Sequence, residues 1–261
     1  MPESLFIVTG ASRGLGAAIA EQLLAPDHTL LCISRGTSDL LHAHAAQCGA
    51  HLAQWPRDLA DAPQVAGEVD AWLRTFDSQR FGDAALINNA GVIARIGPID
   101  ECTTAELSTA LRVGLESALL LTAAFLRATR AWQAMRQGRV KVLNISSGLG
   151  RRAMAGSTPY CAAKAGMDHF SRAAALDEAH RLATQGAGAK IVSLAPGVID
   201  TDMQAQLRSS DATGFPDQDS FLALQAAGQL ATPQAAAAKV LQFLQRSDFG
   251  HAPVADVRDP G

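Results

Sequence analysis

The only tyrosine of the chain, Tyr160, lies four residues before Lys164, and this pair has the residue types needed for proton transfer. Positions i and i+4 are neighbours on one face of a helix, so the ammonium group would lie beside the phenol. A phenol ionises near pH ~10 when unperturbed, and a nearby cation favours the phenolate, which brings the group toward the working range of a general acid or base. A packed tyrosine and a solvated lysine would show the same spacing, so the rest of the chain must decide.

Three glycines near the N-terminus, Gly10, Gly14 and Gly16, form a second candidate site. They stand in the pattern TGxxxGxG between an apolar run over Leu5–Thr9, which predicts a strand, and Ala17–Leu24, which predicts a helix. Without side chains the backbone can turn sharply and approach a pyrophosphate at the helix N-terminus. This context predicts a dinucleotide-binding loop.

Two arginines indicate which dinucleotide the loop would bind. Arg35 directly follows the apolar run Thr29–Ser34, at the place where a dinucleotide fold meets the adenine ribose. An acid there would accept from the ribose 2′-hydroxyl, whereas arginine suits a 2′-phosphate, and Arg13 in the glycine loop could add a second positive charge. Either could be a solvated surface residue, but together they favour NADP(H). Asp58, after a weaker strand over Ala50–Gln54, either binds adenine or caps a helix.

Polar residues and glycines also follow three further apolar runs that predict buried strands. These are Ala84–Asn88 before Asn89, Ala90 and Gly91, Val140–Ile145 before Ser146 and Ser147, and Lys190–Ala195 before Pro196 and Gly197. Strands alternate with helices six times, which predicts the α/β class: a single doubly wound parallel sheet of the Rossmann type with helices on both faces, spanning residues 1–261 as one domain. The carboxyl ends of parallel strands meet at one edge, so we expect all these residues there. The adjacent Asn88 and Asn89 could bond neighbouring loops or line a cofactor.

Capping residues mark the starts of the predicted helices. Ser38 precedes a helix over Asp39–Gln47, and Pro63 lies in the first turn of a helix over Ala62–Phe76. A capping box from Thr103 to Glu106 opens a helical region that runs to about Gln137. Ser157 caps the helix carrying Tyr160, and Thr232 starts a last helix to Leu244. Residues 200–231 break this alternation with polar, glycine and proline residues, which predicts a lid over the site. Val254–Val257 predicts a final edge strand.

Composition excludes several other classes of protein. The 261 residues are 48% hydrophobic, and 22 basic against 25 acidic residues give a net charge of -3, without the bias expected for a nucleic-acid or membrane-surface protein. The four cysteines and seven histidines show no metal-ligand spacing, and the first residues, MPESLFIVTG, have no targeting pattern. The apolar run Ala118–Leu126 is too short to span a bilayer and predicts a buried helix. We expect a cytoplasmic protein with a small-molecule partner, and no metal.

In order and spacing, TGASRGLG (Thr9–Gly16), NNAG (Asn88–Gly91), Ser147, Tyr160 with Lys164, and Pro196 with Gly197 resemble the classical short-chain dehydrogenase/reductase family, over essentially the whole chain. The resemblance implies that NADPH delivers hydride to a carbonyl carbon and that Tyr160 gives the oxygen a proton. Ser147 would hydrogen-bond that oxygen, and Lys164 would lower the tyrosine pKa and hold the nicotinamide ribose. Ser147 lies at the family's usual interval before the tyrosine, and Ser146 is the alternative.

The resemblance also implies a cofactor-binding set that joins the glycine loop to the other strand ends. The set is Gly10, Ser12, Arg13, Gly14, Leu15, Gly16, Arg35, Asp58, Leu59, Asn89, Ala90, Gly91, Tyr160, Lys164, Pro196, Gly197, Ile199, Thr201 and Met203. One departure is Gly114, which stands near the position of the family's catalytic asparagine. In the family, the main-chain carbonyl there helps to hold a water that relays protons to the lysine. Glycine keeps that carbonyl, so we expect activity, although reduced.

The stretches VLNISS, YCAAKAGMD and APGVIDTDMQ more specifically resemble the sepiapterin reductases of this family. That resemblance implies that Asp256 anchors a pterin substrate, with Ser147, Tyr160 and Gly197 completing the substrate site. An exposed carboxylate near a terminus can equally be just solvated.

We therefore expect an NADPH-dependent carbonyl reductase acting on a pteridine side chain or another vicinal dicarbonyl. One alternative is a reductase of another ketone, an alcohol or a 3-oxoacyl thioester. A different alternative, motivated by Gly114, is a dinucleotide-binding redox sensor without catalysis. The apolar surfaces predicted for Glu116–Arg127 and Tyr160–Asp177 exceed what one sheet face needs, and family members often pair through these helices, so we also expect a homodimer.

Overall fold

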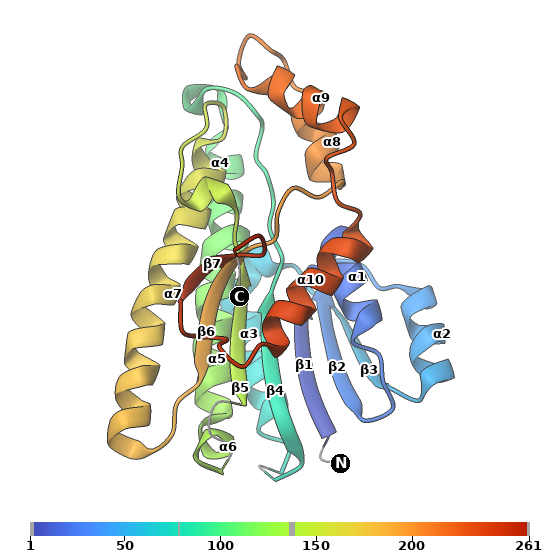
Figure 1. Cartoon of the computed structure of the whole chain (residues 1–261), viewed down its shortest axis with the longest axis vertical. Coiled ribbons are helices and arrows are strands. Elements are labelled where there is room, and N and C mark those ends of the chain that lie inside the picture. The colour runs from blue at the N-terminus through green and yellow to red at the C-terminus, as the bar shows by residue number, and fades with distance from the viewer. Residues whose placement is uncertain (1–2, 78, 136–138, 260–261) are drawn as a thin grey trace.

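One seven-stranded sheet forms the centre of the protein in a computed structural model that describes residues 3–77, 79–135 and 139–259. The strands run in the order β3-β2-β1-β4-β5-β6-β7, and every neighbouring pair is parallel (Figure 1). They are β1 (Glu3–Thr9), β2 (His28–Ser34), β3 (His51–Pro56), β4 (Phe81–Asn88), β5 (Val140–Ile145), β6 (Lys190–Ala195) and β7 (Val254–Asp256). The order reverses between β1 and β4, which is where doubly wound sheets open a crevice for a ligand.

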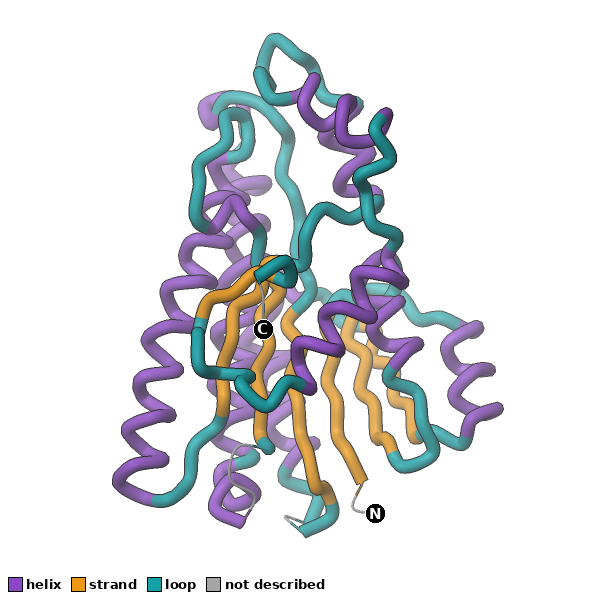
Figure 2. Tube along the Cα trace, in the orientation of Figure 1, coloured by secondary structure: helices purple, strands orange, loops and turns teal. Residues whose placement is uncertain are grey.

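Helices cover both faces of the sheet, which confirms the predicted fold class. They are α1 (Gly14–Gln22), α2 (Asp39–Cys48), α3 (Ala62–Leu73), α4 (Thr104–Leu111), α5 (Ser117–Ala128), α6 (Arg130–Met135), α7 (Thr158–Gln185), α8 (Asp202–Arg208), α9 (Gln218–Ala226) and α10 (Pro233–Gln245). One core cluster joins α1, α2 and α10 to the sheet, and a second joins α3, α5 and part of α7 to the other face. The loops after β1, β4, β5 and β6 gather at one end of the sheet (Figure 2).

Several predicted boundaries and caps agree with the structure. The strands over Val140–Ile145 and Lys190–Ala195 match at both ends. The Ser38 side chain accepts from the Leu41 amide at 3.2 Å, and both hydrogen bonds of the capping box at Thr103 are present. Ser157 holds the predicted N-cap position of α7, but its side chain makes no capping hydrogen bond, so that part of the prediction was wrong.

The predicted long helix is interrupted twice. A π-helical turn, Arg112–Glu116, separates α4 from α5, and the chain leaves helical geometry again at Thr129 before α6. Both breaks carry a hydroxyl that bonds back to a carbonyl four residues earlier, Ser117 to Val113 at 2.8 Å and Thr129 to Phe125 at 2.8 Å. Such back-bonds bend helices, and they are invisible to apolar periodicity. The predicted end near Gln137 lies outside the described residues.

The apolar part of this region packs inside the protein. Among the described residues, one helical stretch, Thr104–Ala128, is long and apolar enough to cross a membrane by length and composition, but 56% of its most apolar window is buried. Within it, α5 contributes Leu121, Ala124 and Phe125 to the core cluster beneath the sheet. The stretch is a core helix, as the run Ala118–Leu126 predicted.

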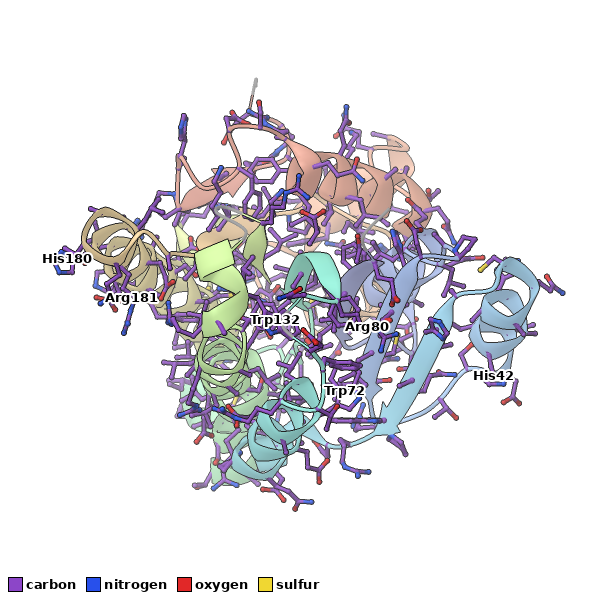
Figure 3. All side chains as sticks on the ribbon, turned by 90° about the horizontal axis from the view of Figure 1, so that it is seen from below. His42, Trp72, Arg80, Trp132, His180 and Arg181 are labelled. Atoms are coloured by element: carbon purple, nitrogen blue, oxygen red, sulfur yellow. The ribbon has the colours of Figure 1, made fainter. Side chains whose placement is uncertain are left out.

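A row of aromatic rings covers one face of the sheet, from the carboxyl end of β3 to the amino end of β4. Trp55, Trp72, Phe76, Phe81 and Trp132 follow one another in edge and tilted contacts with centroids 4.8–5.8 Å apart. The view from below shows Trp72, Arg80 and Trp132 on this side (Figure 3). All three tryptophans of the chain therefore lie in one row of ring contacts, with Trp55 near the carboxyl end of β3 and the other two toward the amino end of β4.

Candidate active site

The glycine loop packs closely enough at Gly10 and Gly16 to leave no room for a Cβ atom at either position. Gly10 and Gly14 have φ angles of +68° and +57°, in the region that favours glycine. A Cβ atom on Gly16 would lie 2.2 Å from the Gly10 carbonyl oxygen and 2.4 Å from Nδ2 of Asn89. The first turn of α1 is thereby pressed against the ends of β1 and β4.

The two asparagines of the NNAG motif have different partners. The Asn89 side chain donates to the Thr9 carbonyl at 3.0 Å, and the Asn89 and Ala90 amides donate to the Thr9 hydroxyl at 2.9 and 3.0 Å. Asn88 is buried and donates to Oδ1 of Asn144 on β5 at 2.8 Å. Asn89 therefore ties the glycine loop to β4, while Asn88 joins β4 to β5, in line with the loop-bonding alternative.

The start of α1 fits an anionic group such as a pyrophosphate. Its N-cap residue, Arg13, makes no capping hydrogen bond within the described residues, and the first turn holds no acidic side chain. The helix N-terminus thus offers free amide donors and the positive end of the helix dipole. Arg35 is exposed at the end of β2, beside this loop. Asp58 accepts from the Ala60 amide at 2.9 Å, which is the capping alternative.

Ser147, Tyr160 and Lys164 meet at the ends of β5 and α7. Ser147 follows β5, accepts from the Leu149 amide at 3.2 Å and lies on the side of the Tyr160 hydroxyl, whose pKa it lowers. Tyr160 lies in the first turn of α7 because Ser157, Thr158 and Pro159 start the helix just before it. Lys164 is 3% exposed; its Nζ lies 5.6 Å from the tyrosine ring centroid and donates to a backbone carbonyl at the end of β5 at 2.6 Å.

The alternative serine faces the other way. Ser146 is 3% exposed and donates its hydroxyl proton to Asp168 on α7 at 2.5 Å. The Ser146 hydroxyl is therefore buried and bonded to Asp168, whereas Ser147 is half-buried and lies on the side of Tyr160. This geometry favours Ser147.

Burial dominates the ionisation of the pair. It raises the pKa of Tyr160 to about 12, against the opposing effect of the Ser147 hydrogen bond, and it lowers the pKa of Lys164 to about 8, against the opposing charge of Asp168. Contrary to the prediction, the tyrosine pKa is raised rather than lowered, because burial of the phenol outweighs any stabilisation of the phenolate by the Lys164 ammonium, which lies over the ring and bonds to the Ile145 carbonyl. At neutral pH the phenol is protonated and the lysine is largely a cation.

Comparison with known proteins assigns the family. The family model described as short chain dehydrogenase matches residues 4–212. The chain belongs to this family. As a short-chain dehydrogenase it is an oxidoreductase of the kind that acts on carbonyl groups and their alcohols, with a fold that binds a nicotinamide dinucleotide.

Two relatives align with this short-chain dehydrogenase over nearly its whole length. A benzil reductase ((S)-benzoin forming) from Bacillus cereus is 33% identical over 93% of this chain and 94% of its own length. A sepiapterin reductase from Rattus norvegicus is 30% identical over 93% of this chain and 92% of its own. The resemblance to sepiapterin reductase is therefore not specific. The crystal structure of a 3-oxoacyl-[acyl-carrier protein] reductase from Brucella melitensis in complex with NAD matches with a TM-score of 0.78 and 24% identity, over 98% of this chain and 96% of that one.

Gly114 lies within the π-helical turn and beside α7, the helix that carries Tyr160 and Lys164. A Cβ atom on Gly114 would lie 3.1 Å from Cβ of Ala163, the residue before Lys164. The glycine therefore lets the turn approach α7 closely. Single π-turns inside helices are frequent at functional sites, and this one occurs without the family's asparagine.

The two ends of the segment 200–231 lie close together, and the segment packs against the loops that follow β4 and β5. Ile199 and Ala231 form an isolated parallel bridge, beyond which α8 and α9 extend. A small apolar cluster joins the segment to these loops and to the residue after Tyr160. It consists of Met154, Leu207 and Phe215, with Ile93, Ile96, Leu149, Cys161 and Phe221 packed against it. The sequence did not indicate this cluster, because its members come from five separate stretches of the chain.

The outer ends of the site carry two ion pairs that the sequence did not indicate. Arg13 pairs with Asp202 at the start of α8 at 2.5 Å, and both side chains are exposed. Asp256 is buried at the end of β7, where both carboxylate oxygens accept from the Arg258 guanidinium at 2.7 and 2.6 Å. This hydrogen bonding lowers the pKa of Asp256. Asp256 is thus not simply solvated, and its role in binding substrate stays a prediction.

Proposed function

We propose that this short-chain dehydrogenase is an NADPH-dependent carbonyl reductase that acts on a ketone or vicinal dicarbonyl. The observation that carries the proposal is that Ser147, Tyr160 and Lys164 lie together at the same sheet edge as the glycine loop, with the Lys164 Nζ 5.6 Å from the Tyr160 ring centroid. A pure binder would not need the only tyrosine of the chain in this position.

A bound nicotinamide dinucleotide supplies the hydride that the carbonyl carbon receives. Tyr160 donates its phenol proton to the carbonyl oxygen, and its raised pKa keeps it in the protonated, donating form at neutral pH. Ser147 donates a hydrogen bond to the same oxygen as negative charge develops there. Lys164 stabilises the phenolate that Tyr160 becomes, and it holds the nicotinamide ribose.

The choice of NADP(H) rests on Arg35 and Arg13. An exposed arginine at the end of β2 suits a 2′-phosphate, and no acid occupies the position that would accept from a 2′-hydroxyl. The relative from Brucella melitensis was solved with NAD, so the fold itself does not decide between the two dinucleotides. Arg13 would exchange Asp202 for the phosphate, at little cost because the pair is exposed.

For the substrate, we favour a vicinal diketone with apolar substituents, such as benzil. Support comes from the name of the Bacillus cereus relative and from the apolar cluster of Met154, Leu207 and Phe215, which packs against Leu149 in the loop after Ser147 and against Cys161 next to Tyr160. A pteridine is the second candidate, supported by the sepiapterin reductase relative and by the position of Asp256. The segment 200–231 would act as a lid that excludes water over either substrate.

The experiment is NADPH oxidation across a panel of benzil, sepiapterin and an acetoacetyl thioester. We expect the highest kcat/KM with benzil. Highest kcat/KM with the thioester would instead indicate a 3-oxoacyl reductase. Tight NADPH binding without turnover of any compound would indicate a non-catalytic redox sensor.

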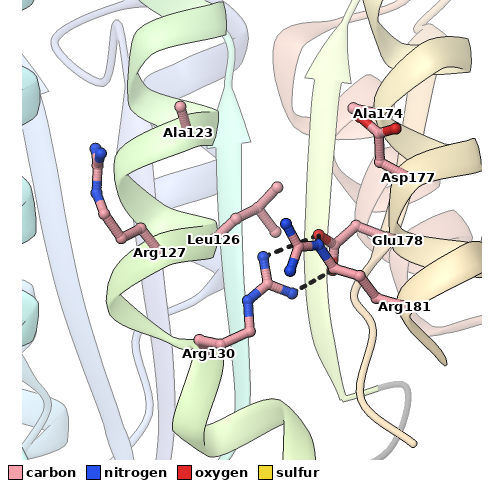
Figure 4. A pocket seen from close by; sticks show the side chains of 8 residues that line it. All are labelled: Ala123, Leu126, Arg127, Arg130, Ala174, Asp177, Glu178 and Arg181. Carbon is pink, nitrogen blue, oxygen red and sulfur yellow. Dashed lines mark hydrogen bonds and ion pairs between the residues drawn. The ribbon is translucent and has the colours of Figure 1, made fainter. Parts of the chain in front are cut away.

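We also propose a homodimer that forms through α5 and α7. Leu119 on α5 and Leu176 on α7 are 44% and 73% exposed, so both helices present apolar side chains to the outside. A hollow of about 370 Å³ lies between α5 and α7, where Arg130 and Glu178 pair across it (Figure 4). A second copy would fill this surface; a monomer mass in solution would contradict the proposal. A cytoplasmic location stays a prediction from the unpaired cysteines.

A further inference from the structure

A buried carboxylate lies directly behind the proposed catalytic residues. Asp168 is 1% exposed and follows Lys164 by four residues on α7, so the two side chains leave the helix on the same side. One carboxylate oxygen accepts from the hydroxyls of Ser146 at 2.5 Å and Ser193 at 2.7 Å. The other accepts from Nε of Arg151 at 3.3 Å. Three hydrogen bonds from other segments of the chain thus hold one charge in the core.

These partners come from the segments that carry the site. Ser146 directly precedes Ser147, and its other neighbour, Ile145, provides the carbonyl that accepts from Nζ of Lys164 at 2.6 Å. Ser193 lies on β6, and Arg151 lies in the loop between Ser147 and Tyr160. Asp168 therefore bonds to both segments that flank Ser147.

Close packing supports the same connection. A Cβ atom on Gly150 would lie 2.8 Å from Oδ2 of Asp168 and 2.9 Å from the Lys164 carbonyl oxygen. The serine loop therefore rests on α7 at this point without an intervening side chain. Arg151 also donates to the Ala255 carbonyl on β7 at 2.7 Å, which extends the network to the last strand.

We infer that Asp168 is a positioning residue of the proposed reductase, which fixes the Ser147 loop through Ser146 and Arg151 and holds the Lys164 ammonium in its charged form. The inference rests on the proposed function for its catalytic meaning, but the placement of the charge does not. Burying a carboxylate costs free energy unless it is paired. Here two of its partners, Ser146 and Arg151, lie in the segments on either side of Ser147.

Few charged groups face this pair. Lys164 faces Asp168 on its own helix and the Tyr160 ring, while Asp168 also faces Arg151 from the serine loop. The carboxylate raises the lysine pKa against the stronger effect of burial. Removing the Asp168 charge should therefore lower the pH at which Lys164 loses its proton. Removing the Arg151 charge should raise it, because the carboxylate is then less neutralised.

The test is an NMR titration of protein labelled with ¹³C-lysine, followed from pH 6 to 10. This range extends at least ~1 pH unit beyond the Lys164 midpoints expected for the wild type and the variants. The chain has only four lysines, Lys141, Lys164, Lys190 and Lys239, so a Lys164→Met sample assigns the signal. We expect the Lys164 midpoint to fall by roughly one pH unit in Asp168→Asn and to rise in Arg151→Met. An unchanged midpoint in both variants would overturn the inference.

Glu178→Gln is the matched control. Glu178 is also a buried carboxylate on α7, paired with Arg130 at 2.9 Å, but it lies more than two turns beyond Asp168. The control should lose stability and leave the Lys164 midpoint in place. If Asp168→Asn does not fold, Arg151→Met still decides the sign, because the Arg151 side chain is one-third exposed.

Turnover then separates the inference from the proposed function. If the wild-type protein reduces benzil, the alkaline limb of kcat should move to lower pH in Asp168→Asn and stay in place in Glu178→Gln. If the wild-type protein reduces none of the panel, the proposed function fails, and the NMR midpoints still test the placement of charge.

Discussion

Replacing each of the adjacent serines at the end of β5 by alanine should affect different properties, turnover in one case and stability in the other. Ser147 faces Tyr160, whereas Ser146 faces Asp168. We therefore expect Ser147→Ala to lose turnover while keeping its stability, and Ser146→Ala to lose stability while keeping more of its turnover.

The magnitudes follow from the partners of each hydroxyl. Removing one donor to a developing oxyanion typically lowers kcat about 10²–10³-fold, which is the loss we expect for Ser147→Ala. Its hydrogen bond to the Leu149 amide is partly exposed, so the cost in stability is about 1 kcal/mol or less. Ser146 loses a buried bond to a charged group, worth roughly 1.5–3 kcal/mol, or a fall in Tm of roughly 3–12 °C.

Both variants would be assayed for NADPH oxidation with benzil and for thermal unfolding by tryptophan fluorescence. The three tryptophans lie on β3, α3 and α6, and their ring contacts involve neither serine, so neither substitution changes their surroundings directly. The reasoning would be refuted if Ser146→Ala lost turnover 10²-fold at unchanged Tm while Ser147→Ala remained active.

Three further substitutions test the cofactor and substrate sites. Gly16→Ala forces the glycine loop off the Asn89 side chain, so NADPH should bind at least about tenfold more weakly in a fluorescence titration, and wild-type affinity would contradict the packing described. Arg35→Asp should reduce the preference for NADPH over NADH by about tenfold or more; an unchanged ratio of dissociation constants would mean that the arginine is only a surface charge. Asp256→Asn should raise KM for sepiapterin and leave KM for benzil as it is, and equal effects on both compounds would reject a pterin anchor.

Much of the fold could be predicted because its strands are buried on both faces. Continuous apolar runs such as Val140–Ile145 and Lys190–Ala195 have clear ends, and parallel strands separated by helices leave few topologies. The caps at Ser38 and Thr103 are local interactions between residues three positions apart, so they also follow from sequence.

The electrostatics of the site could not be predicted in the same way. Spacing places Tyr160 and Lys164 on one helical face, but it does not reveal that burial outweighs the attraction between them. The Asp168 network has a sequence signal, since Tyr160, Lys164 and Asp168 follow at intervals of four. Its partners Ser193 and Arg151 come from other segments, so only the fold shows that the carboxylate is paired.

The central claim is that Tyr160 is the proton donor, and Tyr160→Phe tests it most directly. The substitution removes one hydroxyl from a partly buried ring, so tryptophan fluorescence should report wild-type folding and NADPH should still bind. We predict a loss of benzil-dependent NADPH oxidation of at least about 10²-fold. A folded Tyr160→Phe protein that binds NADPH and reduces benzil at near the wild-type rate would contradict the mechanism.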